Sequence, residues 1–316
     1  MSKITKVKAT ALPRNKDKIL FSEDGNIFFI TMTQNGSTSN MQENNAAFEA
    51  WALYAMTMGY DRVVLAETEH TDELQDIKKL HYNRFLYRAS CFLKGFDWFG
   101  VSDVMQNKIK IFEETELARK LYINAPISKP QEPNEKNHEA VMEKLLTQES
   151  NRRLLNSLLG TNITQFYRQL PVGLFADRVI TGNAIFPGDK AAIDIWGLDG
   201  STFHLIELKV KSNQGLGVLS EVFFYACFMN DMVCRRRLEK EKPADLQKKQ
   251  YQKDGEFHRG YPQLVNANVN AVAAYILTES KHGKLDEAFN LLAKCKIEGI
   301  TFKKVIQHPL FETVER

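Results

Sequence analysis

Three charged residues stand inside a segment that otherwise has the pattern of a buried β-hairpin. Residues 193–211 read IDIWGLDGSTFHLIELKVK, with Asp194 in the first apolar run and Glu207 and Lys209 in the second. Successive side chains of a strand alternate between its two faces, so Glu207 and Lys209 share one face. Two carboxylates and an ammonium group held together can bind a divalent metal and assist attack on a phosphodiester.

The length of the turn decides whether Asp194 joins the other two charges. A two-residue turn at Gly200-Ser201 places Asp194 directly opposite Glu207, and a turn at Asp199-Gly200 makes it a diagonal neighbour on the same face. A three-residue loop would direct Asp194 to the other face unless a bulge intervened. Both turns that the sequence favours therefore predict that the three charges meet. The opposite face is predicted to pack Ile193, Ile195, Ile206 and Leu208.

The spacing D-x12-E-L-K on a hairpin, with one helix before it and another after it, resembles the PD-(D/E)XK nuclease superfamily, which has the restriction-endonuclease-like fold. The resemblance covers roughly residues 139–307. It implies that Asp194, Glu207 and the carbonyl of Leu208 hold Mg²⁺ or Mn²⁺, and that Lys209 is catalytic. The literal Pro-Asp of the motif is missing, because Ile193 precedes Asp194. Asp189, after Pro187 and Gly188, is a second candidate for the metal position.

Glutamates on the two neighbouring helices are further candidates. The same family often adds a glutamate from the preceding helix, and Glu149, eleven residues before Gly160, has suitable spacing. Glu139 and Glu143 are alternatives on the same helix, and each of the three could instead be a solvated helix charge. Glu221, on the following helix, could face the site or make a buried or capping hydrogen bond.

A basic stretch follows the second of these helices. Residues 234–261 contain nine Lys or Arg and five Asp or Glu. Such a segment can contact phosphates without reading base sequence, and a solvated helix end with a mobile loop is the alternative. The residues predicted to bind nucleic acid are Lys211, Arg235, Arg236 and Arg237.

Helices and strands that could position these residues are predicted along the whole chain. In the N-terminal part they are strands 26–32 and 62–68, a helix that ends at Gly59 and a helix over about 71–94. In the C-terminal part they are helix 138–159, strand 168–175, the hairpin, helix 217–233, strand 269–278, helix 285–296 and strand 300–307. This order predicts an α/β protein with a central mixed β-sheet flanked by helices, which is the restriction-endonuclease-like core.

A domain boundary is predicted in the polar segment 123–139. Its three prolines cannot all lie inside one helix or one central strand, and they are Pro126, Pro130 and Pro133. We therefore expect an N-terminal mixed α/β domain over residues 1–128, which selects substrate or mediates assembly. A nuclease-like domain is expected over residues 135–316.

The composition of the 316 residues sets broader limits. A net charge of +3 permits nucleic acid as a partner without requiring it. The four cysteines show no CxxC spacing, which predicts reduced thiols in a cytoplasmic protein. The first ten residues lack the apolar region of a signal peptide, and charged residues interrupt the longest apolar stretch, so no membrane contact is expected. The seven histidines have no zinc-ligand spacing such as HExxH.

These observations predict a metal-dependent nuclease that acts on nucleic acid, DNA rather than RNA. A role in bacterial restriction or antiphage defence follows only by analogy at the level of the fold. A homo-oligomer or a partner protein bound through the N-terminal domain is also expected. The alternatives are a catalytically inactive module that binds nucleic acid or a protein, and an assembly role in which the hairpin charges form an internal salt-bridge network. Arg84 and Arg88 are expected to be exposed, with an anion site as the alternative.

Overall fold

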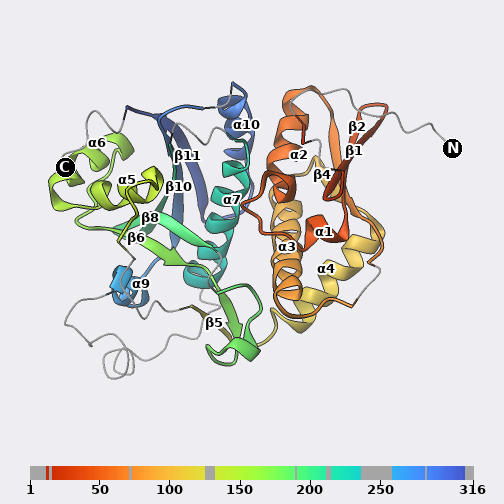
Figure 1. Cartoon of the computed structure of the whole chain (residues 1–316), viewed down its shortest axis with the longest axis horizontal. Helices are drawn as coiled ribbons and strands as arrows, with labels where there is room; N and C mark the ends of the chain where they lie inside the picture. The colour runs from red at the N-terminus through yellow and green to blue at the C-terminus, as the bar shows by residue number, and fades with distance from the viewer. Residues whose placement is uncertain are drawn as a thin grey trace.

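The chain folds as a mixed α/β protein with two main sheets, each covered by helices (Figure 1). The computed structural model describes residues 12–13, 16–70, 73–124, 132–188, 191–210, 215–235, 258–281 and 283–309. At this level the predicted fold class is confirmed. Among the described helices, none has the length and apolar character needed to cross a bilayer.

The N-terminal part contains a four-stranded sheet in the order β1-β2-β3-β4. The first two strands form an antiparallel hairpin, and β2, β3 and β4 are parallel to one another. The strands are β1 (Ile19–Asp24), β2 (Ile27–Met32), β3 (Arg62–Glu67) and β4 (Phe99–Val101). The helices are α1 (Gln34–Ser37), η1 (Asn44–Ala46), α2 (Phe48–Thr57), α3 (Asp76–Gly95) and α4 (Asp103–Thr115).

Strands β2 and β3 and helices α2 and α3 agree with the sequence, whereas strand β1 and helix α4 were not predicted. Strands β2 and β3 occupy the predicted ranges, and Gly59 follows α2 with a φ of 94° that suits a helix end. Helix α3 begins at Asp76, later than expected. Strand β4 has three residues and was not predicted, because so short a segment carries no readable periodicity.

The C-terminal part contains a five-stranded mixed sheet in the order β11-β10-β9-β8-β6. Strands β6, β8 and β9 are antiparallel neighbours, whereas β9, β10 and β11 are parallel. The strands are β6 (Phe166–Pro171), β8 (Ala192–Asp199), β9 (Thr202–Lys209), β10 (Ala271–Thr278) and β11 (Ile300–Gln307). Strands β5 (Leu121–Ile123) and β7 (Leu174–Ala176) form a separate pair that joins the two parts of the chain.

Helices cover both faces of this sheet (Figure 1). The helical segments of this part are α5 (His138–Leu146), η2 (Glu149–Asn151), α6 (Arg152–Leu159), η3 (Thr181–Asn183), α7 (Val218–Met229), η4 (Asn230–Cys234), η5 (His258–Gly260), α9 (Tyr261–Asn266) and α10 (Leu285–Leu292). The single helix predicted over residues 138–159 is interrupted. The side chains of Thr147 and Asn151 bond to backbone carbonyls of α5 and so compete with the continuing helix.

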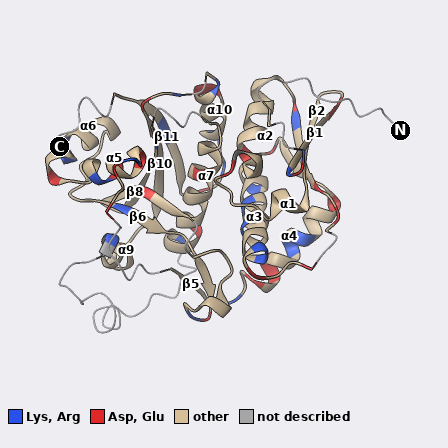
Figure 2. Ribbon diagram, viewed as in Figure 1, with Lys and Arg blue, Asp and Glu red and all other residues tan. Residues whose placement is uncertain are grey.

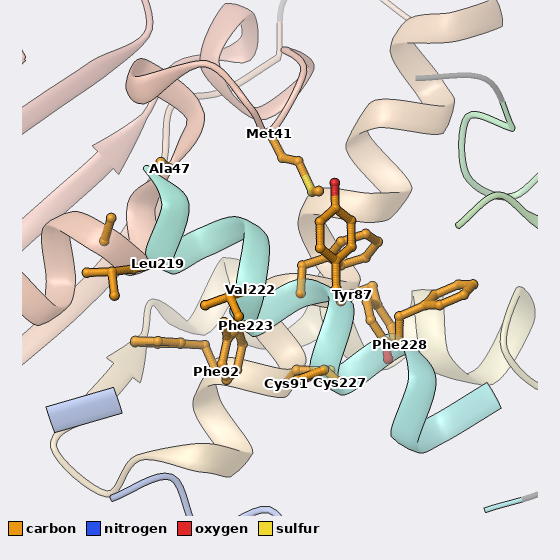
Figure 3. Packing of buried hydrophobic residues seen from close by; sticks show 14 of the residues in the cluster. Met41, Ala47, Tyr87, Cys91, Phe92, Leu219, Val222, Phe223, Cys227 and Phe228 are labelled. Atoms are coloured by element: carbon orange, nitrogen blue, oxygen red, sulfur yellow. The ribbon is translucent and has the colours of Figure 1, made fainter. Parts of the chain in front are cut away.

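One hydrophobic core runs from the N-terminal sheet to the near face of the C-terminal sheet, and Figure 3 shows its part between α3 and α7. Helices α2 and α3 lie against α7 and α10, and the rings of Phe92 and Phe223 meet with centroids 5.1 Å apart. A second core, which includes Met142 and Leu146, fills the opposite face beneath α5 and α6. The predicted boundary lies partly in residues 125–131, outside the described part, and the division into two domains stays a prediction.

Candidate functional site

The hairpin of β8 and β9 has the two-residue turn that brings the predicted charges together. Asp199 pairs with Thr202, and Gly200 has a φ of 58°, which a residue without a Cβ adopts readily. Continued along the strands, this register places Asp194 directly opposite Glu207. Of the two turns that the sequence left open, the structure has the one at Gly200-Ser201.

The face opposite the charges has the expected character for three of its four predicted residues. Ile195, Ile206 and Leu208 belong to the core beneath α5 and α6, whereas the prediction that Ile193 joins them is wrong, because Ile193 packs into the other core. The backbone N–H of Leu208 donates to Asp194 Oδ2 at 2.9 Å, which fixes the carboxylate across the two strands. The role of the Leu208 carbonyl as a metal ligand stays a prediction.

Lys209 lies among carboxylates from three elements. Its Nζ donates to Glu207 Oε1 at 2.8 Å and to Glu221 Oε2 on α7 at 3.3 Å. The same atom is 3.6 Å from Glu139 Oε1 on α5. Burial alone lowers the pKa of Lys209, but the surrounding carboxylates, led by Glu207, raise it well above its ordinary value. Lys209 is therefore a fixed positive charge at the centre of the group.

The two hairpin carboxyl groups are buried and close to each other. Asp194 is 8% exposed and Glu207 1% exposed. Burial raises the pKa of both, most strongly for Glu207, whose pKa is raised further by the charge of Asp194. The two residues lie opposite each other on the adjacent strands β8 and β9. Oε2 of Glu207 is buried and has no hydrogen-bond partner among the described residues.

Helix α5 supplies two further acids, in place of the glutamate predicted at position 149. Glu143 is buried and accepts a hydrogen bond from Nε2 of Gln169. Burial, with the charge of Asp194, raises the pKa of Glu143 to about 8, and burial also raises the pKa of Glu139. Glu149 is exposed and pairs with Arg152 at 2.7 Å, because the interruption after α5 directs it to solvent.

Tyr225 is a neighbour of the site that the sequence did not reveal. It lies one helical turn after Glu221 on α7, and its buried hydroxyl has no hydrogen-bond partner among the described residues. Burial raises its pKa, and so do the charges of Glu207 and Glu221. The signal that could have found it is the four-residue spacing from Glu221, which places both side chains on one face of the helix.

The predicted basic residues do not join this group in the described structure. Arg235 is exposed after η4 and donates to the carbonyl of Glu298 at 3.4 Å. At 1.5 Å per residue, it lies about 20 Å along the helix from Glu221. The other predicted positions, which lie outside the described residues, are Asp189, Lys211, Arg236 and Arg237.

Four of the acids around Lys209 are buried, and they are Glu143, Asp194, Glu207 and Glu221. Figure 2 shows acidic positions in red on β8, α5 and α7. Within the described ranges, no set of three or more His, Cys, Asp or Glu side chains has a metal-holding arrangement. The carboxylate pair of Asp194 and Glu207 still matches a metal that keeps most of its waters, since Mg²⁺ often takes one or two protein carboxylates. The unpartnered Oε2 of Glu207 is an available donor atom for such an ion.

Helix α3 also carries two arginines whose predicted exposure is wrong. Arg84 is 1% exposed and Arg88 2% exposed, because α3 lies between the N-terminal sheet and α7. Arg88 Nε donates to Glu49 Oε1 at 2.7 Å. Arg84 Nη2 lies within hydrogen-bond distance of Asn40 and His81, while its Nη1 has no partner among the described residues.

Comparisons with protein-family models, curated proteins and solved structures give no match to this chain.

Proposed function

We propose that this chain is a metal-dependent nuclease that hydrolyses phosphodiester bonds of nucleic acid, with DNA as the preferred substrate. The observation that carries the proposal is the meeting of Asp194, Glu207 and Lys209 on adjacent strands. Lys209 bonds directly to Glu207, and the amide of Leu208 holds Asp194. Carboxylates beside a fixed ammonium group are the parts that metal-assisted phosphoryl chemistry requires.

The order of the surrounding elements supports the same proposal. Helices α5 and α6 precede the antiparallel strands β6, β8 and β9, and α7 then leads to the parallel strand β10. A restriction-endonuclease-like core would place a helix on each side of such a mixed sheet. The N-terminal part would then select substrate or mediate assembly, with bacterial restriction or antiphage defence as the proposed setting.

Asp194 and Glu207 would hold Mg²⁺ or Mn²⁺, with the Leu208 carbonyl as a third proposed ligand. The bound ion would lower the pKa of its water and neutralise charge that develops on the phosphate. The residues fit this role because Glu207 Oε2 has no donor against it and the two carboxyl groups lie side by side. Without a bound metal ion, both carboxyl groups retain protons more strongly than in water, even with Lys209 beside them.

Lys209 would stabilise negative charge in the site, and Glu143 would accept or release a proton. The Lys209 ammonium group would stabilise negative charge on the phosphate or orient the attacking water. A pKa of about 8 would let Glu143 accept or release a proton near neutral pH, which is the range that general acid–base catalysis uses. Its hydrogen bond with Gln169 holds the carboxyl group in place.

The test is a cleavage panel run with the purified full chain. Single- and double-stranded DNA and RNA are incubated with Mg²⁺, Mn²⁺ or EDTA, and products are separated on gels. Cleavage should require the metal and should be lost in Lys209→Ala and Asp194→Asn, but kept in the exposed control Glu149→Gln. Cleavage that persists in Lys209→Ala would overturn this site.

An inactive module that binds nucleic acid or a partner protein is the second candidate. It is favoured by the absence of a three-residue metal cluster among the described residues and by the several carboxylates that hold Lys209. It predicts salt-dependent binding that needs no metal and that survives Asp194→Ala. Binding without cleavage in the same panel would favour this candidate over the nuclease.

A further inference from the structure

The edge strand beside the carboxylate group is distorted at one residue. Arg168 pairs with Ile195 and Leu170 with Ile193, so Gln169 lies opposite Asp194 on the neighbouring strand. Gln169 has a φ of 58°, a left-handed conformation that residues with a Cβ rarely adopt. Such strain persists only where surrounding contacts enforce it, and it is concentrated at functional sites.

A second strained residue holds this distortion in place. Arg259 has a φ of 55°, and its Nη1 donates to the carbonyl of Gln169 at 2.8 Å. The carbonyl of Arg259 accepts a hydrogen bond from Trp196 Nε1 at 3.2 Å. Gly260 follows with its Cα close against Tyr167 and Trp196, where a Cβ would lie 2.5 Å from the tyrosine ring. The Arg259 guanidinium group is therefore held against β6 at Gln169, the residue that lies opposite Asp194.

Arg168 is a second arginine near Arg259 and Glu143. Its partner Ile195 packs beneath α5, so Arg168 lies on the side of Glu143. Burial lowers the pKa of Arg259, and the positive charge of Arg168 lowers it further. The pKa of Glu143 is raised by burial, and the charge of Arg168 is a smaller, opposing effect on it. Arg168 and Arg259 are both half-buried, whereas Asp194 is buried. Two neighbouring cations thus stand at the rim of a buried acidic group.

We propose that Arg168 and Arg259 form a docking pair for the phosphates of a nucleic-acid strand, adjacent to the phosphate that is cut. This inference rests on the proposed nuclease function and names its substrate contacts. Guanidinium groups bind phosphate oxygens through paired donors. The distorted strand sets their position relative to Asp194, and thereby the position of the strand over the carboxylates.

The test measures binding separately from cleavage. Fluorescence anisotropy with labelled single- and double-stranded DNA in EDTA gives the dissociation constant over a range of salt concentrations. The variants are Arg168→Gln, Arg259→Gln, the double substitution, the charge-keeping Arg259→Lys and the exposed control Arg153→Gln on α6. Each loss of a phosphate contact should reduce the slope of log K against log salt by about 0.9 for duplex and about 0.7 for single strands.

We expect each single glutamine variant to bind roughly 5- to 10-fold more weakly, and the double variant roughly 50-fold, irrespective of base sequence. Arg259→Lys should recover most of the affinity, and Arg153→Gln should match the wild type. With Mg²⁺, the glutamine variants should raise KM and leave kcat within about twofold. Far-ultraviolet circular dichroism checks that every variant is folded.

The outcomes separate this inference from the proposed function. Unchanged affinity and salt slope in the double variant would overturn the docking pair, even if Lys209→Ala abolishes cleavage. A wild type that binds through these arginines but cuts nothing would keep the docking pair and remove the nuclease. A wild type that binds no nucleic acid at low salt would overturn the docking pair.

Discussion

Glu143 gives a direct test of the buried acidic group, because its pKa is raised from 4.5 to about 8. Burial is the main cause, and the charge of Asp194 adds to it. The folded chain thus keeps a proton that the unfolded chain releases above about pH 4.5. This carboxyl group favours folding fully below its unfolded pKa, and that contribution is lost as the pH rises to the folded value.

The size of the effect follows from the two pKa values. One pKa unit corresponds to 1.36 kcal/mol, so the free energy of unfolding should fall by about 3 to 4 kcal/mol between pH 5 and pH 8 because of this one group. Glu143→Gln removes the titration and keeps an oxygen that can accept from Gln169. Relative to the wild type, the variant should therefore gain about 3 to 4 kcal/mol over the same range.

The assay is urea unfolding followed by tryptophan fluorescence at pH 5, 6, 7 and 8. The difference between variant and wild type is the quantity of interest, because the other carboxyl groups contribute to both proteins. Glu149→Gln is the matched control, since that side chain is exposed. If Glu143→Gln and the wild type lose stability in parallel from pH 5 to pH 8, Glu143 ionises at no cost and its burial against Asp194 is incorrect.

Three further predictions concern the arginine pair, the metal and the edge strand. Arg88→Met should lower the free energy of unfolding by about 3 to 5 kcal/mol, because it leaves Glu49 buried without its counter-ion. Arg84→Met, one turn earlier, should change it by no more than about 1 kcal/mol, because burial lowers the pKa of Arg84 to about 9 and no carboxylate is bonded to it among the described residues. Equal urea midpoints for the two variants would contradict this prediction. Addition of Mg²⁺ should raise the unfolding temperature of the wild type but not of Asp194→Asn. The increase should grow from pH 6 to pH 8, because the ion must displace protons from Asp194 and Glu207. Calorimetry in two buffers of different ionisation enthalpy would detect the released protons, and the absence of proton release would argue against this site. Gly260→Ala should lower the urea midpoint, because the residue has a φ of 72° and a Cβ there would lie 2.5 Å from the ring of Tyr167; the control Gly182→Ala, which meets nothing within 4 Å, should leave the midpoint unchanged.

The geometry of the hairpin could be predicted because it depends on short-range rules. Strand periodicity fixes which side chains share a face, and a loop of two residues fixes the register. Glu207 and Lys209 could therefore be assigned to one face before their contacts were known. The strand predicted over residues 300–307 matches β11 for the same reason.

The contribution of α5 could not be predicted because it depends on competing hydrogen bonds. One continuous helix was predicted over residues 138–159, and Glu149 was chosen by its spacing from Gly160. Thr147 Oγ1 instead bonds to the carbonyls of Glu143 and Lys144, and Asn151 Nδ2 bonds to that of Leu145. The helix stops there, so the acids that face the hairpin come from the turns before the interruption.

The burial of Arg84 and Arg88 has a different cause. Their spacing indicated one helical face, and charged residues on such a face are usually exposed. Helix α3 is covered on two sides, by the N-terminal sheet and by α7, so no exposed face remains at these positions. A sequence pattern describes one helix, whereas this outcome depends on a second element more than a hundred residues away.

The contrast between the two buried charged groups bears on function. Arg88 and Glu49 form a pair in which one cation meets one anion, which packing alone can explain. Around Lys209, a single cation faces Glu207, Glu221 and Glu139, and the pKa of Glu207 is raised. Apolar residues at these positions would stabilise the sheet, since burying excess charge costs free energy. Departures from local stability rules are typical of functional sites, and an acidic excess beside rim arginines is suited to a bound cation and a phosphate together.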